Sequence, residues 1–310
     1  MLKTYLVAAI AAIVRSIDLE TEGTVSAEWI VYPDGEMERV RVDPNLYPAV
    51  FKWPRDSPRC GATMVSRRMA LTAAHCVRGR ENIDSDLSMP VELTDGDDNY
   101  TTYNIVDIRV NECWNRDIDP YGYYSSYARK WEADIAVLVL DRDISPAGGA
   151  VEGTHYLKPW VTADDGSVEG LTFMLAGWGR SGEVGRERDD SDLDRSMTVF
   201  HRGFNTVNRV YKNMIIFDLD QPDAVDAVDL ESMGYYGDSG SGAIYEEADG
   251  TLRIIGVLSS GQGIFYGSQH YYVYVGDYHS SWIQENIDSI DKHVGAPLCG
   301  KPSLNVDVES

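Results

Sequence analysis

The chain has 310 residues, of which 43% are hydrophobic; this allows one large globular domain or two smaller ones and excludes a largely disordered chain. Its 50 acidic residues outnumber its 27 basic ones, so the formal net charge is −23. Because binding to nucleic acid or to an anionic membrane needs clustered Lys and Arg, this charge argues against both partners.

The N-terminus has the pattern of an export signal. Lys3 precedes an apolar run from Tyr5 to Val14, which has the length of a signal-peptide core and is too short to span a bilayer. We therefore expect a signal-like segment at residues 1–14, a possible propeptide at 15–29, and a secreted protein with no membrane contact after signal removal. A buried N-terminal strand or helix is the alternative.

Short apolar runs alternate with turn-rich segments along the rest of the chain. Their lengths and their Val, Ile and Tyr content are typical of buried strands. The runs are Met64–Ala74, Tyr103–Val110, Ile135–Leu140, Leu171–Gly177, Met214–Phe217, Leu252–Leu258 and Tyr271–Val275. Asp249-Gly250 predicts a hairpin, and the polar stretches 181–196 and 218–232 have the composition of loops.

One helix is predicted near the C-terminus, at about residues 280–293. Apolar residues recur there at helical spacing, and acidic residues occupy the other face. Residues 293–310 would form a C-terminal tail. The whole pattern predicts an all-β protein with a terminal helix.

Two further predictions concern one acidic loop. The loop containing Asp95, Asp97, Asp98 and Asn99 is expected to be an acidic turn without metal, with an oxygen-liganded calcium site as the alternative. Asn99 also begins an Asn-x-Thr sequon, which matters only if the source glycosylates its proteins.

Three segments carry residues suited to acyl transfer. His75 ends an apolar strand, where small neighbours leave room for a substrate. Asp134 opens a buried strand, and Ser239 lies in the glycine-rich run 237–242, where a sharp turn can expose a hydroxyl and aim backbone amides at one point. In isolation each segment also has a structural interpretation: a packed histidine, a turn residue or an ordinary loop.

Together, His75, Asp134 and Ser239 in this order resemble the chymotrypsin-like (trypsin-like) serine peptidase family. Cys60 and Cys76 flank His75 as in that family. Other matching motifs are Gly177-Trp178-Gly179, Gly256-Val257-Leu258-Ser259-Ser260-Gly261 and Trp282-Ile283. The resemblance extends over about residues 30–292, which we take as a peptidase domain.

The resemblance implies two packed six-stranded antiparallel β-barrels, at about residues 47–140 and 157–275, followed by the C-terminal helix. The active site would lie in the cleft between the barrels. By the family's mechanism, Ser239 is the nucleophile, His75 the general base and Asp134 the group that orients it, and the amides of Gly237 and Ser239 hold the oxyanion. This chemistry needs neither a metal nor an organic cofactor.

The four cysteines fit two disulfides better than a zinc or redox centre, because no Cys-x-x-Cys pair occurs. Spacing alone leaves three connectivities open. The resemblance implies Cys60–Cys76, and Cys113 and Cys299 then have only each other.

The resemblance also implies activation by proteolysis, in which a new N-terminal amine pairs with Asp238. Ile30-Val31 resembles the apolar pair that begins the mature enzymes, so Ile30 is the expected partner. The bond between Arg15 and Ser16 is a rival processing site.

Departures from the family pattern surround the substrate pocket. Ser241 replaces the second glycine after the nucleophile, Tyr235 replaces a cysteine, and Ser260 replaces a tryptophan on the substrate strand. These changes affect the shape of the pocket and leave the three catalytic positions intact.

The expected pocket residues are Met233, Gly234, Ser259, Ser260 and Gly261. Met233 stands where relatives that cut after Arg or Lys carry an aspartate, and a buried unpaired cation costs several kcal/mol. We therefore expect cleavage after apolar residues such as Leu, Met, Phe or Tyr, between walls left open by the two glycines. There are two alternatives. The negative net charge could favour cleavage after basic residues, and His270 could favour cleavage after acidic residues if it lies near the pocket.

These features predict a monomeric serine endopeptidase that acts on proteins or peptides and is open to protein inhibitors. A catalytically inactive homologue that binds a partner through the same cleft is one alternative. A serine esterase is the other alternative, since acyl transfer to esters uses the same catalytic residues.

Overall fold

The computed structural model describes residues 30–32, 37–54, 59–77, 89–95, 99–114, 132–146, 148–161, 165–184, 197–263 and 265–290. The predicted signal-like segment, the propeptide, the tail 293–310, Cys299, Asp97 and Asp98 lie outside these ranges. No helix among the described residues is long and apolar enough to cross a membrane.

The first half of the molecule is built on a five-stranded antiparallel sheet in the order β2-β3-β4-β8-β7. Its strands are β2 (Val50–Trp53), β3 (Cys60–Met64), β4 (Met69–Thr72), β7 (Ile105–Val110) and β8 (Ala136–Leu140). Every residue of β3, β4 and β8 is buried, which explains their nearly continuous apolar sequences. A separate two-stranded sheet pairs β5 (Val91–Thr94) with β6 (Tyr100–Tyr103).

The second half is an eight-stranded sheet, ordered β12-β10-β15-β16-β17-β14-β13, with β9 paired to β16. Its strands are β9 (Lys158–Pro159), β10 (Thr172–Gly177), β12 (His201–Thr206), β13 (Arg209–Tyr211), β14 (Met214–Asp218), β15 (Gly242–Glu246), β16 (Leu252–Gly261) and β17 (Gln269–Tyr274). Its core includes edge-to-face contacts of Phe173 with Phe217 and with Tyr272.

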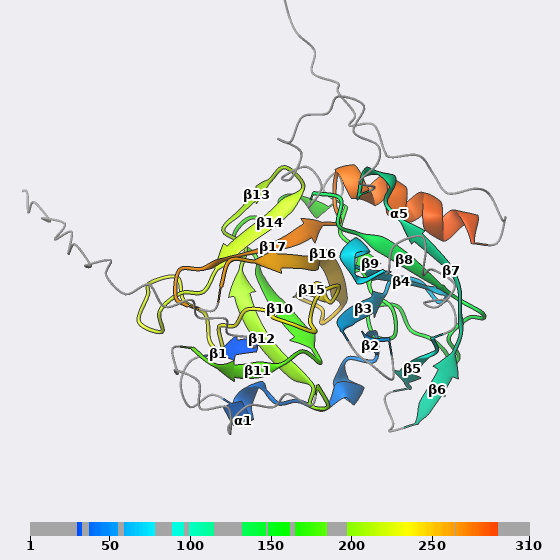
Figure 1. Ribbon diagram of the computed structural model, residues 1–310, viewed down its shortest axis with the longest axis horizontal. Coiled ribbons are helices and arrows are strands. Elements are labelled where there is room, and N and C mark those ends of the chain that lie inside the picture. The colour runs from blue at the N-terminus through cyan, green and yellow to red at the C-terminus, as the bar shows by residue number, and fades with distance from the viewer. Residues whose placement is uncertain are drawn as a thin grey trace, which may run out of the picture.

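Figure 1 shows the two curled sheets side by side, the five-stranded one on the right and the eight-stranded one on the left. Helix α5 (Tyr278–Ser289) lies on the first of these, where Arg109 of β7 donates hydrogen bonds to Asn286 and Ser289. The predicted all-β architecture with a C-terminal helix is confirmed. The described strands form sheets of five, two, eight and two, the last pairing β1 (Ile30–Tyr32) with β11 (Ser181–Glu183). This differs from two sets of six, partly because β9 joins by parallel pairing that local sequence patterns do not indicate.

Two local predictions have different outcomes. The hairpin at Asp249-Gly250 is confirmed, since β15 and β16 pair antiparallel across it and Gly250 adopts a positive φ of 86°. The stretch 181–196 is not entirely loop, because β11 (Ser181–Glu183) pairs in parallel with β1 (Ile30–Tyr32). The remaining short elements among the described residues are α1 (Met37–Val40) and the 3₁₀ turns at Pro44–Leu46, Ala74–Cys76 and Glu112–Trp114.

Candidate active site

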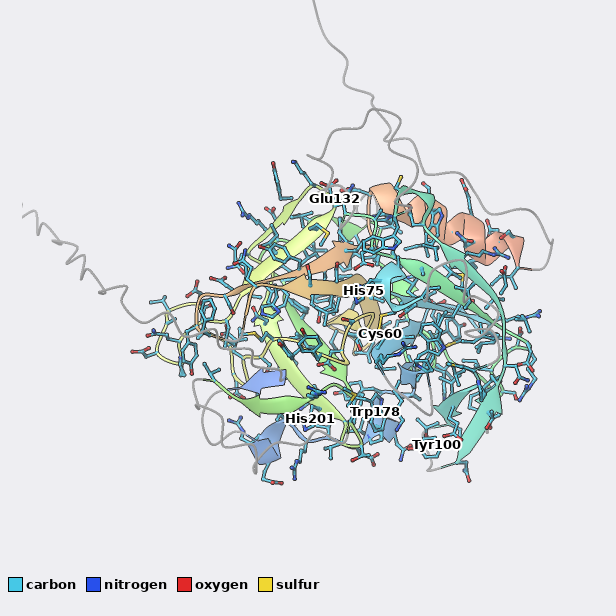
Figure 2. All side chains as sticks on the ribbon, viewed as in Figure 1. Cys60, His75, Tyr100, Glu132, Trp178 and His201 are labelled. Atoms are coloured by element: carbon cyan, nitrogen blue, oxygen red, sulfur yellow. A yellow bond between two sulfur atoms is a disulfide. The ribbon has the colours of Figure 1, made fainter. Side chains whose placement is uncertain are left out.

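His75 lies in the 3₁₀ turn that follows strand β4, at the junction of the two halves (Figure 2). The next residue, Cys76, forms a disulfide with Cys60 at the start of β3, so the predicted Cys60–Cys76 bridge is confirmed. The bridge anchors the turn to the sheet, while the imidazole of His75 remains partly exposed. Cys113 is also disulfide-bonded, and its predicted partner, Cys299, lies outside the described residues.

Asp134 is fully buried and holds His75 at two points. One carboxylate oxygen accepts the backbone N–H of His75 at 2.8 Å, and the other lies 2.7 Å from Nδ1 of the ring. Because a carboxylate can only accept, Nδ1 carries the hydrogen and Nε2 of the neutral ring is left as the basic nitrogen. The pair has the arrangement required of an oriented general base.

The glycine-rich turn brings Ser239 from the second half against this pair. Its backbone carbonyl accepts the N–H of Gly61 in β3 at 2.8 Å, and Sγ of Cys76 lies 3.6 Å from the same oxygen. Gly240 follows with a φ of 84°, and a Cβ there would collide with the carbonyl of Gly61. Only glycine fits so close an approach of two backbones. The structure thus brings together all three residues predicted to be catalytic.

The backbone amides around Ser239 divide into two sets. The N–H groups of Asp238, Gly240 and Ser241 donate hydrogen bonds to backbone carbonyls. Those of Gly237 and Ser239 donate none to any residue that the structure describes. These two unused amides are separated by one residue, and one of them belongs to Ser239 itself. Together they can receive a developing oxyanion.

Asp238 is buried and points away from the solvent. Its carboxylate accepts hydrogen bonds from the amides of Gly179, at 2.8 Å, and Tyr235, at 3.2 Å. No cation among the described residues pairs with it, and burial, only partly offset by the two amides, raises the pKa of Asp238 to about 7. Ile30, its expected partner, pairs with Ser181, two residues beyond Gly179, and its nitrogen is an amide in the intact chain.

A family model for trypsin matches residues 40–283 of the chain. The chain belongs to the trypsin family. Three similar relatives are the serine protease Hayan of Drosophila melanogaster, a CLIP domain-containing serine protease B15 of Anopheles gambiae, and the serine protease ea of Drosophila melanogaster.

The identities to these relatives are 26%, 27% and 27%, over 74%, 70% and 81% of this chain. The matches cover 35%, 57% and 66% of the relatives themselves, so the trypsin-family chain spans only part of their length.

The two glycines expected in the pocket walls of this trypsin-family member are packed against side chains, whereas open walls were expected. A Cβ at Gly234 would collide with Leu258, and a Cβ at Gly261 would overlap the ring of His270. The space that each glycine releases is therefore already filled by a side chain of the protein itself. Met233 and His270 are both buried, while Ser260 is partly exposed.

Ser259 has a position that the sequence motif did not indicate. It was expected in the substrate-binding set, yet its hydroxyl donates to Asp134 at 2.7 Å. Ser241, the replacement for a family glycine, is buried against β3, where a Cβ at Gly61 would overlap its hydroxyl. The residues that these two side chains lie against come from distant segments, so local spacing carries no signal for their positions.

Two other clusters contain side chains of the types that bind metals. The cluster of Cys60, His75 and Cys76 has metal-ligand spacing, but the two sulfurs form a disulfide and are not thiolates. In the predicted acidic turn, both oxygens of Asp95 accept hydrogen bonds from Asn99.

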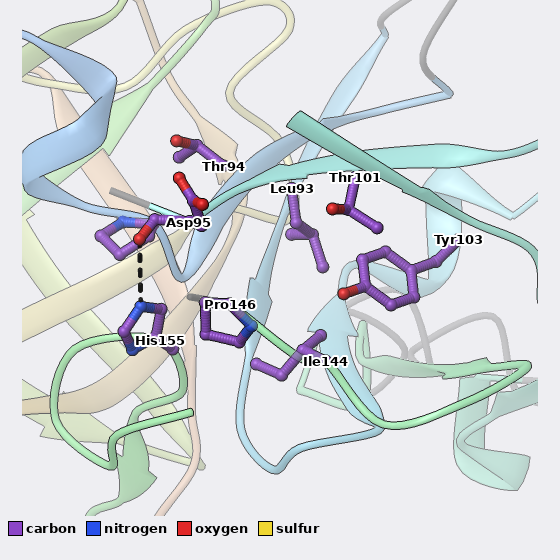
Figure 3. A pocket seen from close by; sticks show the side chains of 9 residues that line it. Leu93, Thr94, Asp95, Thr101, Tyr103, Ile144, Pro146 and His155 are labelled. Atoms are coloured by element: carbon purple, nitrogen blue, oxygen red, sulfur yellow. Dashed lines mark hydrogen bonds between the residues drawn. The ribbon is translucent and has the colours of Figure 1, made fainter. Parts of the chain in front are cut away.

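Figure 3 shows a small pocket beside that turn, where His155 lies 3.4 Å from the carbonyl of Asp95. Its volume of about 10 Å³ holds at most one water, which is too little for a substrate.

Proposed function

We propose that the chain is a serine endopeptidase that hydrolyses peptide bonds through Ser239, His75 and Asp134. The observation that carries this proposal is the bidentate hold of Asp134 on His75 beside the turn that contains Ser239. An oriented imidazole whose second nitrogen is basic can take the proton from the hydroxyl of a serine on the neighbouring glycine-rich turn.

In the proposed reaction, Ser239 Oγ attacks the carbonyl carbon of the substrate while Nε2 of His75 takes the hydroxyl proton. The same proton then passes to the leaving amine, and the acyl-enzyme is hydrolysed by water along the reverse path. Asp134 stabilises the imidazolium that forms. The unused amides of Gly237 and Ser239 receive the oxyanion, and loss of one such donor costs about 3–4 kcal/mol of transition-state stabilisation.

Activation is proposed to proceed by cleavage before Ile30, with Ser16 as the rival new N-terminus. The carboxylate of Asp238 is buried and has no cationic partner among the described residues, so a new amine would offset its desolvation. The pairing of β1 with β11 places Ile30 within a few residues of the segment that touches Asp238.

Proteins or peptides are the proposed substrates of a monomeric enzyme. Protein inhibitors that occupy the substrate-binding cleft are proposed as further partners. Secretion is proposed from the signal-like segment at residues 1–14 and from the Cys60–Cys76 disulfide. At the pocket floor the uncharged Met233 is expected to disfavour basic substrates.

A fluorophosphonate probe tests the proposal. The full chain, before and after limited proteolysis with its N-terminus sequenced, should be labelled on Ser239, and Ser239→Ala should not be labelled. Digestion of casein by the labelling-competent form distinguishes a peptidase from an esterase. A processed, folded protein that takes no label would contradict the proposal and favour the inactive homologue.

A further inference from the structure

Asp134 belongs to a short segment, residues 132–135, that leads into strand β8. Its side chain is fully buried, so the position of the carboxylate depends on where this backbone lies. The N–H of Ile135 donates to the carbonyl of Ala133 at 2.8 Å, and the N–H of Asn111, which follows β7, donates to the carbonyl of Ile135 at 3.1 Å. The strand side of the segment is therefore fixed by its neighbour in the sheet.

His279 holds the other side of this segment. It lies in the first turn of α5 and is fully buried, and its Nε2 lies 2.8 Å from the carbonyl oxygen of Glu132, two residues before Asp134. Because a carbonyl can only accept, Nε2 carries the hydrogen and donates it. Figure 2 shows Glu132 beside the beginning of α5. The C-terminal helix is therefore hydrogen-bonded to the backbone that carries the proposed orienting carboxylate.

Helix α5 gives His279 a rigid support. Trp282 and Ile283, in the turn that follows, are buried in the core. Further along the helix, Arg109 of β7 donates to Asn286 at 3.1 Å. A side chain on an element that is anchored along its length can fix the position of the group that it contacts.

The contact does not depend on a charge. Burial lowers the pKa of His279 to about 4, although the hydrogen bond to Glu132 partly opposes the shift. The ring is therefore neutral at neutral pH. It supplies a hydrogen-bond donor at a fixed position and adds no charge to the pair formed by Asp134 and His75.

We propose that His279 is a positioning residue of the active site. Its hydrogen bond to Glu132 fixes the backbone that sets the carboxylate of Asp134 against His75. This inference rests on the proposed peptidase function and adds to it a residue of the C-terminal helix. The carboxylate meets three donors at 2.7–2.8 Å, namely the backbone N–H and Nδ1 of His75 and the hydroxyl of Ser259. A small displacement of the segment would weaken all three bonds at once.

Three variants of the processed enzyme test this role. His279→Leu removes the donor from the carbonyl of Glu132. His279→Gln offers an amide N–H at about the reach of Nε2, whereas His279→Asn offers the same amide on a side chain that is one methylene shorter. The control is His155→Leu, which removes the contact between another histidine and a backbone carbonyl, that of Asp95, in the small pocket of Figure 3.

We expect His279→Leu and His279→Asn to lower kcat about tenfold with little change in KM, and His279→Gln to recover most of this loss. In the impaired variants the acidic limb of the pH profile of kcat/KM should move to lower pH, because a displaced Asp134 stabilises the imidazolium of His75 less. The control should change neither quantity. Urea unfolding gives the folded fraction of each variant, to which kcat is referred.

An unchanged kcat in both His279→Leu and His279→Asn would overturn the inference. So would a loss of kcat that His279→Gln shares in full, or one that leaves the acidic limb in place, since either result would indicate a packing role only. If His279→Leu does not fold, the comparison of His279→Gln with His279→Asn decides. If the unmodified enzyme takes no fluorophosphonate label on Ser239, the proposed function is refuted and this inference falls with it.

Discussion

The hydroxyl of Ser259 donates a hydrogen bond to Oδ2 of Asp134, with 2.7 Å between the oxygens. That carboxylate oxygen is also the partner of Nδ1 of His75. Ser259 lies on β16 of the second half, whereas Asp134 lies next to β8 of the first. The group that orients the general base is therefore itself fixed from the opposite half of the molecule.

Removing this support should weaken catalysis without abolishing it. Ser259→Ala takes one donor from a fully buried carboxylate, and hydrogen bonds to charged groups are stronger than neutral ones. We expect kcat to fall about tenfold with a smaller change in KM, measured by steady-state kinetics. Ser280→Ala on α5, which loses only a bond to the carbonyl of Asp277, the residue that precedes this helix, is the control. An unchanged kcat in Ser259→Ala would show that the bond has no catalytic consequence.

The three proposed catalytic residues should act as a unit. Ser239→Ala, His75→Ala and Asp134→Asn should each lower kcat by several orders of magnitude, and combining them should add little. Single-turnover kinetics on the processed enzyme measure this. Asp249→Asn, in the exposed hairpin turn, should behave like the unmodified enzyme. Near-normal activity of Ser239→Ala would be incompatible with the proposed mechanism.

Asp238 should make the uncut chain less stable as the pH rises. Its pKa is raised from 3.8 to about 7 in the folded state, so folding favours the protonated acid. This stabilisation is fully present below about pH 4 and is lost as the pH rises through about 7, with an amplitude of up to about 4 kcal/mol.

Comparison with Asp238→Asn isolates this effect. Two of the buried histidines, His270 and His279, have pKa values lowered to about 4, so they contribute the opposite trend. Urea unfolding of both chains between pH 4 and pH 8 should show that Asp238→Asn gains stability relative to the unmodified chain as the pH rises. After proteolysis the difference should shrink, because a new amine would pair with Asp238. A pH-independent difference in the uncut chain would refute the prediction.

Replacing Ser241 should stabilise the protein. Its hydroxyl is buried with no partner among the described residues, so Ser241→Ala relieves an unsatisfied polar group and should raise the free energy of unfolding by about 1 kcal/mol. Thr63→Val is the contrasting variant, because Thr63 accepts the N–H of Gly242 at 3.0 Å and its loss should destabilise. Chemical denaturation measures both, and a destabilised Ser241→Ala would show that its hydroxyl does have a partner.

The features that the sequence predicted well are those set by short segments. The helix near residues 280–293 appears as α5, the hairpin forms at Asp249-Gly250, and the Cys60–Cys76 bridge is present. A family motif around His75 predicted the bridge. Helical periodicity predicted α5, and turn chemistry predicted the hairpin.

The features that the sequence missed depend on pairing between distant segments. Strand β11 exists because it pairs with β1, about 150 positions earlier in the chain. The register of β17 against β16, which contains an irregularity between Leu258 and Ser260, decides that His270 faces Gly261. A one-residue slip reverses which face a strand residue occupies, so composition could not place His270.

Gly61 and Ser241 compete for a single volume, since a Cβ at the first would overlap the hydroxyl of the second. The order in which these two positions can change during evolution is therefore constrained. Gly61→Ala is disfavoured while the hydroxyl of Ser241 is present, and it becomes easier to accommodate once Ser241→Ala or Ser241→Gly has removed that oxygen. A lineage descending from this protein is therefore expected to change Ser241 before Gly61.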